Sequence, residues 1–260
     1  MQDLTDKHRL SATVVLYHAG VELLQCLQSF QDSDVFLDLY VVNNSPGDTS
    51  FFSGKWSCPG LHYMPENKNV GYGRANNDVL PKLRSTYHII CNPDVSFAPD
   101  ALRRMMQLMD ETGATILTPR VLNPDGTEQF LPRMAPTVSR LLARRTNWNG
   151  RYWQQKRSEY TLEGQDITAP MAVEFATGCF MMVRTRVLVQ QLHGFDPRFF
   201  LYHEDSDLSR RVLESGGSIV YAPDVTVTHA WRRDSAHSPS ATMHHLKSTL
   251  QYFNKWGWVW

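Results

Sequence analysis

The sequence predicts an α/β fold built on a mixed, mostly parallel central sheet flanked by helices. Strand-like and helix-like patterns alternate through the first hundred residues, which is the rhythm of parallel strands joined by crossover helices. The strand-like runs are short and rich in β-branched and aromatic residues, as buried strands are. Turn residues follow several of these runs directly, and open α/β sheets bind their ligands beyond the carboxyl ends of their strands.

The first elements can be placed from periodicity and turn signals. Residues 12–17 form a β-branched run suited to a buried first strand. A helix is expected at 21–30, because its apolar residues recur on one side. The second strand, 37–42, ends at the turn signal NNSPGD. A third strand is expected at 61–64, and a loop rich in Gly and Asn leads from it to a helix that begins near residue 75.

The next elements continue the same alternation. A strand at 87–91 ends at the tripeptide NPD. Pro99 starts a helix at 100–111 and Gly113 stops it. Residues 114–121 then form another strand, and NPDGTEQ after it is typical of a turn.

The second half of the chain is less regular. Residues 130–170 are basic and aromatic, and they fit either a mobile, acceptor-facing excursion or an ordinary solvated loop. Strand character returns at 173–183, and a helix that ends at residue 192 follows. Two short strands are expected at 219–221 and 225–228.

Composition limits the class of protein. The 260 residues include 26 Lys and Arg against 26 Asp and Glu, so no basic field favours nucleic acid as the partner. The four cysteines lack CxxC spacing, which argues against a structural zinc site or a dense disulfide framework and fits a reducing cytosol. The chain starts with a polar, charged segment rather than a secretory signal, and no apolar window is long enough to span a bilayer. We therefore expect a soluble or peripheral protein.

The most informative segment is FFLYHEDSDLSRR, at 199–211. An aromatic and apolar run stops there at Glu204, Asp205 and Asp207, and a helix begins that ends at 216–217. Acidic side chains are favoured in the first turn of any helix, because they complement its free N–H groups and its dipole. The cluster therefore has two interpretations, an ordinary helix N-terminus or a group of catalytic carboxylates.

Asp94 and His229 each follow a strand-like run. A carboxylate beside a buried strand is costly unless a cation or a donor satisfies it, and imidazole is a common ligand of divalent metals. Together with pyrophosphate oxygens, the two side chains would form a mostly oxygen site suited to Mg²⁺ or Mn²⁺. Taken alone, an Asp in a turn or a single His is more often structural than functional.

The loop PENKNVGYGRANN contains Gly71 and Gly73. These glycines would allow close backbone approach to a ligand, and the following helix would present N–H groups to an anion. They lack the full dinucleotide fingerprint, so an ordinary Asn-rich loop is the alternative. Asn43 and Asn44 lie at the carboxyl end of the second strand, where a ligand is expected.

The C-terminal segment, ATMHHLKSTLQYFNKWGWVW, mixes lysines with Leu, Tyr, Phe and Trp. Aromatic rings beside lysines suit a lipid headgroup interface. The same rings could instead pack as core or in an oligomer contact.

The order of motifs resembles a known family. Along the chain these motifs are VVLYH, VVNNSPGD, ENKNVGYGRANN, CNPDVSF, ATGCFMMVR, GFDPRFFLYHEDSDLSRR and VTHA. From about Ser11 to His229 they look like the family 2 glycosyltransferases with the GT-A fold. NPD in place of a DxD motif, together with HLKSTLQYF, makes the chain similar to bacterial rhamnosyltransferases of O-antigen assembly.

The resemblance implies roles for particular positions. Asp94 and His229 match metal-binding residues of the family. Asp205 matches the general base that deprotonates the acceptor hydroxyl, and Glu204 and Asp207 would support it or contact the acceptor. The donor-binding residues that the resemblance implies are Tyr17, His18, Asn43, Asn44, Glu66, Asn67, Asn69, Gly71, Gly73, Asn92 and Arg211. His18 stands where Asn is usual and Asn43 replaces the commoner Asp, so the identity of the nucleotide base stays open.

The resemblance also implies a domain organisation. An N-terminal extension would cover 1–10, a GT-A domain 11–235 and an amphipathic, aromatic-rich helical tail 236–260. Within the GT-A domain, about 11–98 would bind the nucleotide and about 99–235 the acceptor.

The activity implied is that of an inverting, metal-dependent hexosyltransferase. It would move L-rhamnose from dTDP-rhamnose onto a polyprenyl-diphosphate-linked saccharide of the GlcNAc type, in O-antigen, lipopolysaccharide or surface polysaccharide biosynthesis. Such an enzyme would work as a peripheral protein on the cytoplasmic face of the bacterial inner membrane, held there by its C-terminal tail. Two alternatives stay open: a same-fold transferase with UDP-galactofuranose, UDP-GlcNAc or UDP-glucose as donor, and a non-catalytic nucleotide-sugar-binding subunit.

Overall fold

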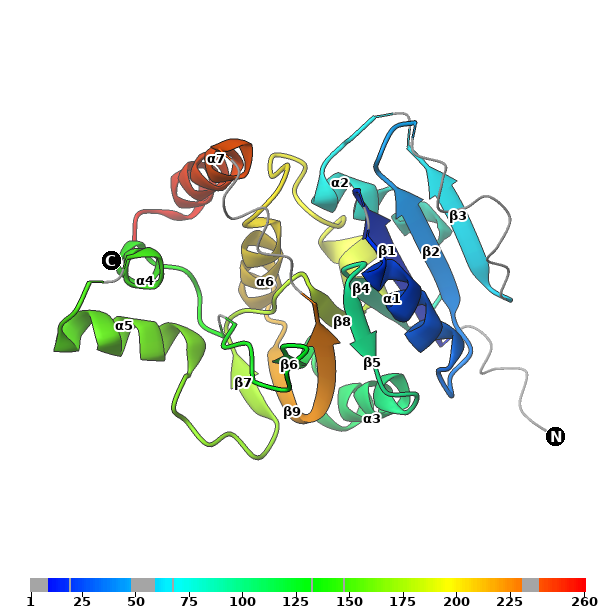
Figure 1. Ribbon diagram of the computed structural model, residues 1–260, viewed down its shortest axis with the longest axis horizontal. Coiled ribbons are helices and arrows are strands. Elements are labelled where there is room, and N and C mark those ends of the chain that lie inside the picture. The colour runs from blue at the N-terminus through cyan, green and yellow to red at the C-terminus, as the bar shows by residue number, and fades with distance from the viewer. Residues whose placement is uncertain are drawn as a thin grey trace.

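A mixed β-sheet runs through the centre of the protein, and helices cover both of its faces (Figure 1). The computed structural model describes residues 9–18, 20–47, 59–66, 68–131, 133–146, 148–230 and 239–260. Across these residues the strand order is β3-β2-β1-β4-β8-β6-β9-β5, and β7 pairs with β9 beside that row.

The strands and helices have the following bounds. The strands are β1 (Leu10–Leu16), β2 (Asp38–Asn43), β3 (Leu61–Pro65), β4 (Tyr87–Cys91), β5 (Val95–Phe97), β6 (Ile116–Leu122), β7 (Met171–Val173), β8 (Phe180–Arg184) and β9 (Ile219–His229). The helices are α1 (Glu22–Gln31), α2 (Tyr72–Asn77), α3 (Ala101–Thr112), α4 (Val138–Arg145), α5 (Arg151–Thr161), α6 (Glu204–Glu214) and α7 (Pro239–Trp256). A 3₁₀ turn at Leu80–Lys82 and a π turn at Val187–Gln191 are also present.

Strand direction confirms the predicted fold class. The strands β3, β2, β1 and β4 pair in parallel, and so do β6 and β9. Antiparallel pairing occurs where β8 lies between β4 and β6, and where β5 and β7 flank β9. The carboxyl ends of β1 to β4 therefore lie at one edge of the sheet, where α/β folds bind ligands.

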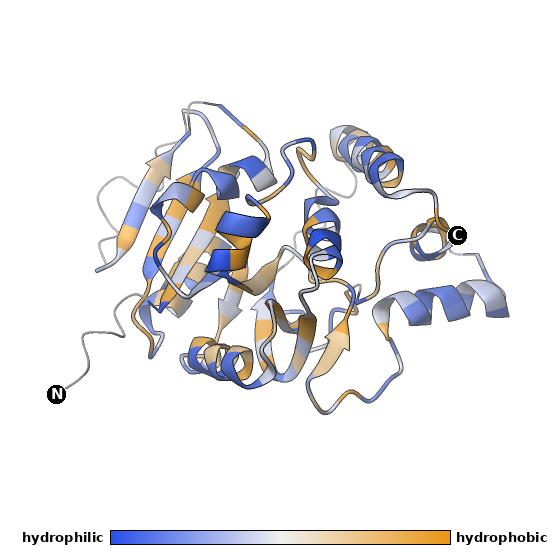
Figure 2. Ribbon diagram, turned by 180° about the vertical axis from the view of Figure 1, so that it is seen from behind, coloured by the Kyte–Doolittle hydropathy of each residue, from blue (hydrophilic) through white to orange (hydrophobic). Residues whose placement is uncertain are grey.

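Successive residues of the central strands enter cores on opposite faces of the sheet. Val14 of β1 and Ile89 of β4 pack with residues of α1 and α3. Their neighbours Val15 and Ile90 pack with α2 and α6 respectively. Because side chains alternate along a strand, burial of both faces requires the continuous apolar runs seen in this sequence. Figure 2 shows apolar residues concentrated on these strands.

The structure confirms the elements expected up to residue 121, with one addition. The three-residue strand β5 was not predicted, because a run this short has no readable periodicity. It places Asp94 directly before a strand that pairs with the end of β9.

The expected irregular excursion at 130–170 is wrong, because it contains the helices α4 and α5. One of their arginines, Arg157, is not simply solvated. The guanidinium of Arg157 donates to the carbonyls of Ala143 (3.1 Å), Thr146 (3.4 Å) and Trp148 (3.2 Å). A cation that satisfies the last carbonyls of a helix stabilises it, so Arg157 of α5 ties its helix to the end of α4.

Two other strand predictions need correction. The strand expected at 173–183 is two strands, β7 and β8, separated by a loop that turns toward α6. The strands expected at 219–221 and 225–228 are one continuous strand, β9, whose register against β6 shifts between Pro119 and Arg120. The Ala-Pro-Asp interruption in β9 forms part of this irregularity rather than a turn, as proline in a sheet commonly does.

The C-terminal helix α7 is anchored to the rest of the protein. Tyr252 and Phe253 are buried in a small aromatic core. The ammonium group of Lys255 and the indole N–H of Trp256 both donate to the carboxylate of Asp207 on α6. Part of the aromatic tail therefore packs as core, which was one of the two alternatives.

The expected domain boundaries stay predictions. The strand β1 begins at Leu10, and 1–8 lie outside the described residues, as does the start of the tail, 236–238. One sheet contains strands from both sides of residue 98. In the described part of the chain, no helix combines the length and the apolar composition needed to cross a membrane.

Asp207→Asn should lower the free energy of unfolding by about 3–5 kcal/mol, the usual cost of removing one partner from a buried ion pair. Asp207 is 0% exposed, and its loss would leave Lys255 and Arg211 without their shared carboxylate. Urea denaturation measures the effect. Asp100→Asn is the matched control, because this exposed carboxylate lies 4.0 Å from Arg104, and it should cost less than about 1 kcal/mol. A similarly small change for Asp207→Asn would mean that the network does not anchor α7.

Candidate active site

Two asparagines at the end of β2 hold the loop that follows β3. The side-chain N–H of Asn43 donates to the hydroxyl of Tyr63 (2.9 Å). The side-chain N–H of Asn44 donates to Oδ1 of Asn69 (2.9 Å), and its Oδ1 accepts the backbone N–H of Val70 (2.8 Å). Both asparagines are buried. Their amide groups therefore shape this end of the sheet from within.

Tyr17 and His18 project from the end of β1 beside these asparagines. Both side chains are exposed, and their rings meet edge to face with centroids 4.5 Å apart. The backbone N–H of His18 donates to the hydroxyl of Ser45 (2.7 Å). His18 has φ 46°, the left-handed region that non-glycine residues seldom occupy. The structure thus brings the first two strand ends together, as expected.

The next predicted donor-binding residues follow β3 and β4. The backbone N–H of Glu66 donates to the carbonyl of Asn43 (2.9 Å), and partial burial raises the pKa of the Glu66 carboxyl. Asn92 follows β4, and its backbone N–H donates to the carbonyl of Cys179 (2.8 Å). Asn67 lies outside the described residues.

Gly71 and Gly73 pack against protein atoms rather than opening toward a ligand. Gly71 has φ 89°, and a Cβ there would lie 2.4 Å from the carbonyl oxygen of Phe200. A Cβ on Gly73 would lie 2.9 Å from Cβ of Phe195 and 3.6 Å from Cβ of Glu204. The missing side chains let α2 approach the segment before α6. This packing role replaces the close ligand approach that the sequence suggested.

Glu204 and Asp205 begin α6 in different surroundings. Asp205 is partly exposed, and its carboxylate accepts the backbone N–H groups of Gly178 (3.1 Å) and Ser206 (2.7 Å). Glu204 is only 6% exposed, and its Oε2 is buried without a hydrogen bond from the described residues. The preceding residue, His203, has φ 62°, which turns the chain sharply into the helix.

Burial shifts the pKa of both carboxyl groups. Burial, with added repulsion from Asp205, raises the pKa of Glu204 to about 8. Burial also raises the pKa of Asp205, against the opposing effect of its backbone hydrogen bonds. Near neutral pH, Glu204 therefore holds a proton. An accessible carboxylate of raised pKa is suited to act as a general base.

Asp94 and His229 face each other where β5 pairs with β9. Val95 lies opposite His229 in the antiparallel register, and the backbone N–H of Ala230 donates to the carbonyl of Asp94 (2.9 Å). The distance from Nε2 of His229 to Oδ1 of Asp94 is 3.3 Å. The predicted pair is therefore formed by residues more than a hundred positions apart in the sequence.

The pair fits a divalent cation. Oδ1 of Asp94 is buried and accepts no hydrogen bond from the described residues. Two ligands at about 2.1 Å from an ion and at right angles to each other lie about 3 Å apart, close to the separation seen here. Within the described ranges, no group of three or more His, Cys, Asp or Glu side chains is placed to hold a metal. Further ligands would have to be oxygens of a diphosphate or of water.

Gly178 and Cys179 connect the two acidic centres. The N–H of Gly178 donates to Asp205, while the carbonyl of Cys179 accepts the N–H of Asn92, two residues before Asp94. Burial, and then the charges of Asp94 and Asp205, raises the pKa of the Cys179 thiol to about 12. Both carboxylates therefore lie close to this one segment, and the two centres belong to a single site.

Asp207 and Arg211 lie outside this site. The guanidinium of Arg211 donates to Asp207 (2.7 Å) and to the carbonyls of Leu192 (2.8 Å) and Gly194 (2.8 Å). Contrary to expectation, neither side chain is directed to an acceptor or a diphosphate. At about 100° per residue, Asp207 lies about 200° around the helix from Asp205, so the two carboxylates leave α6 on different sides.

Sequence reasoning missed several residues that complete the site. Gln129 hydrogen-bonds His229 through both ends of its amide, at 2.7 Å to the backbone carbonyl and 3.1 Å to Nδ1. The hydroxyl of Tyr72 donates to the carbonyl of Gly178 (2.7 Å). The motifs NPDGTEQ and ATGCF contained Gln129 and Gly178, but their local patterns predict only a turn and a strand.

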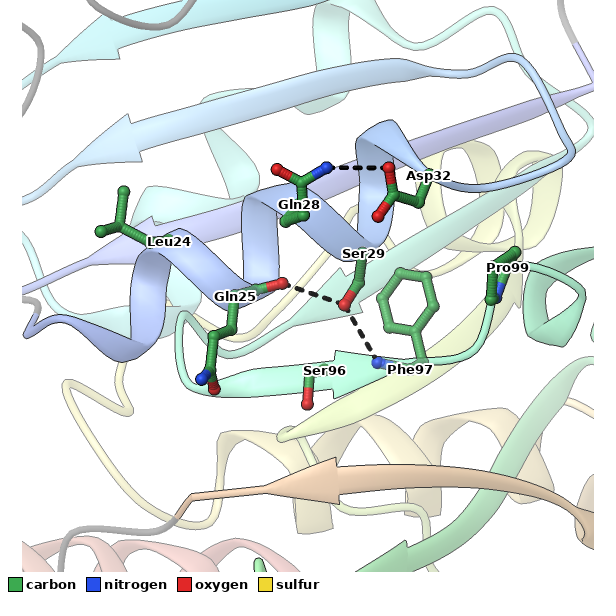
Figure 3. Close-up of a pocket in the computed structure, with 8 residues that line it drawn as sticks. All are labelled: Leu24, Gln25, Gln28, Ser29, Asp32, Ser96, Phe97 and Pro99. Carbon is green, nitrogen blue, oxygen red and sulfur yellow. Dashed lines mark hydrogen bonds between the residues drawn. The ribbon is translucent and has the colours of Figure 1, made fainter.

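A groove of about 640 Å³ lies elsewhere, between α1 and β5 (Figure 3). The hydroxyl of Ser29 donates to the carbonyl of Gln25 (2.9 Å) and accepts the N–H of Phe97 (3.2 Å) there. Its lining contains none of the predicted site residues. The groove is therefore separate from the candidate active site.

Comparison with known proteins identifies related sequences. The model of the family described as Glycosyl transferase family 2 matches residues 11–192. The N-acetylglucosaminyl-diphospho-decaprenol L-rhamnosyltransferase of Mycobacterium tuberculosis is 27% identical over 261 residues, covering 92% of this chain and 82% of its own length. The rhamnosyltransferase WbbL of Escherichia coli is 23% identical, covering 74% and 73% of the two chains.

Solved structures confirm the GT-A fold. A mannosyltransferase from Pyrobaculum calidifontis, in complex with GDP-Man and Mn²⁺, has a TM-score of 0.62 at 16% identity and covers 95% of this chain. GalNAc-T7, solved with UDP, GalNAc and Mn²⁺, has a TM-score of 0.69 at 14% identity and covers 96%. The chain spans 63% and 48% of these two proteins. At these identities the likeness concerns the fold alone.

Glu204→Gln should change the free energy of unfolding differently at two pH values. The difference between variant and wild type should favour the variant more at pH 8 than at pH 5. A carboxyl whose pKa is higher in the folded than in the unfolded chain contributes stability at low pH, which is lost as the pH rises from about 4.5 toward its folded value of about 8. Urea denaturation at both pH values tests this. Glu214→Gln, at an exposed position of the same helix, should change stability equally at both. A pH-independent effect of Glu204→Gln would contradict the protonated state of Glu204.

Proposed function

Because the chain belongs to glycosyl transferase family 2, we propose that it is an inverting, metal-dependent hexosyltransferase. The observation that carries this proposal is the connection of two acidic centres through Gly178 and Cys179. Asp205 supplies an accessible carboxylate on one side, and Asp94 with His229 supplies a cation site on the other. A sugar nucleotide bound at this edge of the sheet would have its diphosphate near the second centre.

We propose L-rhamnose as the transferred sugar, dTDP-rhamnose as its donor, and a polyprenyl-diphosphate-linked saccharide of the GlcNAc type as the acceptor. Similarity over 92% of the chain to a mycobacterial enzyme named for L-rhamnosyl transfer to such a lipid supports the sugar and the acceptor. The dTDP-linked donor rests on the resemblance of the sequence motifs alone. Similarity to the rhamnosyltransferase WbbL supports the sugar. The product would belong to O-antigen or another surface polysaccharide.

Asp205 is the proposed general base. It would take the proton of the acceptor hydroxyl as that oxygen bonds to the anomeric carbon. The bond from that carbon to the diphosphate oxygen breaks, and its electron pair leaves with the diphosphate. One displacement from the opposite face inverts the anomeric centre. The N–H groups of Gly178 and Ser206 orient the carboxylate, and the protonated Glu204 adds no second negative charge beside it.

Asp94 and His229 would hold Mg²⁺ or Mn²⁺ against the donor. When bound, such an ion neutralises charge that develops on the departing diphosphate. At the other end of the site, the exposed rings of Tyr17 and His18 are suited to contact the nucleotide. Asn43 and Asn44 would fix the floor of that pocket, since their amides already hold the surrounding loop.

We also propose that α7 docks the protein on the cytoplasmic face of the inner membrane. Met243, Leu246 and Leu250 are 65%, 52% and 43% exposed. Their spacing of three and four residues places them on one side of the helix. Trp258 and Trp260, after the helix, are exposed as well. Apolar side chains along one face of a surface helix, ending in tryptophans, match an interfacial segment.

Cations lie near α7. The C-terminal segment adjoins α4 (Figure 1), where the N–H of Val138 donates to the carbonyl of Val259 (2.8 Å). Arg144 and Arg145 end α4, and their charges add to burial in lowering the pKa of His245 on α7. Arginines close to a helix that docks on a membrane favour anionic lipid headgroups.

With dTDP-rhamnose, Mn²⁺ and a polyprenyl-diphosphate GlcNAc acceptor, the wild-type protein should transfer rhamnose, and Asp205→Asn should lower turnover at least about 10²–10⁴-fold. Dissociation constants for dTDP-rhamnose should stay within about twofold, because Asn keeps the size of the side chain and its bond from Ser206. Transfer of radiolabelled sugar and calorimetric titration measure the two quantities.

Asp224→Asn is the matched control, since Asp224 is exposed on β9, and it should leave turnover unchanged. If the protein turns over only with UDP-galactofuranose, UDP-GlcNAc or UDP-glucose, the proposed transfer reaction stands and dTDP-rhamnose is the wrong donor. Binding without turnover on any donor would indicate a non-catalytic subunit. Loss of both binding and turnover in Asp205→Asn would assign Asp205 a structural role.

Leu246→Gln combined with Leu250→Gln should weaken cosedimentation with phosphatidylglycerol vesicles at least about tenfold, because two leucines would no longer be buried in lipid. Point changes are preferable to truncation, since Phe253 and Lys255 anchor α7. Leu24→Gln on α1, at a leucine 42% exposed, is the matched control. Unchanged partitioning of the double variant would remove α7 as the membrane contact.

A further inference from the structure

We infer that Gln129 is a positioning residue that fixes the tautomer of His229 and so presents Nε2 of that ring to a divalent cation. The inference rests on the proposed function of Asp94 and His229 as metal ligands. It concerns a residue that contacts the backbone and the ring of His229 at the same time.

The backbone holds Gln129 in place. Its N–H donates to the carbonyl of Val121 in β6 (2.8 Å), and its own carbonyl accepts the N–H of Leu131 (2.6 Å). The chain therefore folds back after β6, and Gln129 lies beside that strand. The Gln129 side chain is only 6% exposed and reaches the end of β9.

The orientation of the Gln129 amide follows from its partners. A backbone carbonyl can only accept, so the atom 2.7 Å from the carbonyl of His229 is the side-chain Nε2. The atom 3.1 Å from Nδ1 of His229 is then the side-chain oxygen. An amide oxygen cannot donate, so Nδ1 of the neutral ring carries the proton.

The tautomer decides what His229 offers to Asp94. With the proton on Nδ1, the lone pair of the neutral ring lies on Nε2, which is 3.3 Å from Oδ1 of Asp94. Two electron-rich atoms at this distance repel each other unless a positive charge lies between them, either a metal ion bound to both or the second ring proton of an imidazolium. With the proton on Nε2, the ring would instead donate to Asp94 and occupy the site. Gln129 selects the first form, the arrangement in which a metal-bound histidine donates its second N–H to a fixed acceptor.

Gln129→Met tests the inference, because it removes both hydrogen bonds at nearly constant volume. Mn²⁺ affinity in the presence of dTDP, measured by calorimetry or electron paramagnetic resonance, should fall about 10–100-fold. In the metal-free protein, ¹⁵N resonances of His229 should shift from the Nδ1-protonated toward the Nε2-protonated form. Gln155→Met is the matched control: its exposed amide donates to Glu159 (2.9 Å) on α5, and neither quantity should change.

Asp94→Asn in the same titration separates this inference from the proposed function. If Asp94→Asn loses affinity while Gln129→Met binds Mn²⁺ within twofold of wild type and keeps the His229 tautomer, the role of Gln129 is overturned and the metal pair stands. If Asp94→Asn binds Mn²⁺ as tightly as wild type, the metal pair is wrong and the inference falls with it. Should Gln129→Met fail to fold, Gln129→Asn, one methylene shorter and unable to make both bonds, gives the same test.

Discussion

The hydrogen bonds of Gly178 and Cys179 are the constraint on which the site depends. This segment leads into β8, the antiparallel strand between β4 and β6. The N–H of Gly178 donates to Asp205 at the start of α6, and the carbonyl of Cys179 accepts the N–H of Asn92, just before Asp94. Because backbone N–H and C=O groups must be paired when buried, the same bonds that satisfy this loop hold the two acidic centres together.

Position on α6 separates the three acids of its first turn. Asp205 is partly exposed, Glu204 is buried and protonated, and Asp207 is buried but neutralised by Lys255 and Arg211. Successive side chains of an α-helix point in directions about 100° apart around its axis. One turn can therefore contribute a candidate base, a neutral acid and an anchor for α7. Hydrogen bonds to Asp207 thereby connect α7 to the helix that carries Asp205.

Prediction from the sequence worked where structure is local. The strands and helices up to residue 121 follow from periodicity, caps and turn residues, which depend only on neighbours in the chain. It failed at 130–170, where the donor groups of Arg157 bind carbonyls of another element. It also misjudged Gly71 and Gly73, because a glycine admits a neighbouring side chain as readily as a ligand. Motif order located Asp94, Asp205 and His229, and their catalytic roles stay predictions.

By itself, the sequence determined the fold class, the family resemblance and the strand ends that carry Asn43, Asn44 and Asp94. Apolar periodicity and turn chemistry are properties of contiguous residues, and these suffice to specify a mostly parallel sheet. Only the tertiary structure decided that Asp207 supports α7 and that Gln129 contacts His229. Burial and hydrogen-bond geometry across a hundred residues of separation set the charge of a carboxyl and the tautomer of a ring, and no local pattern contains that information.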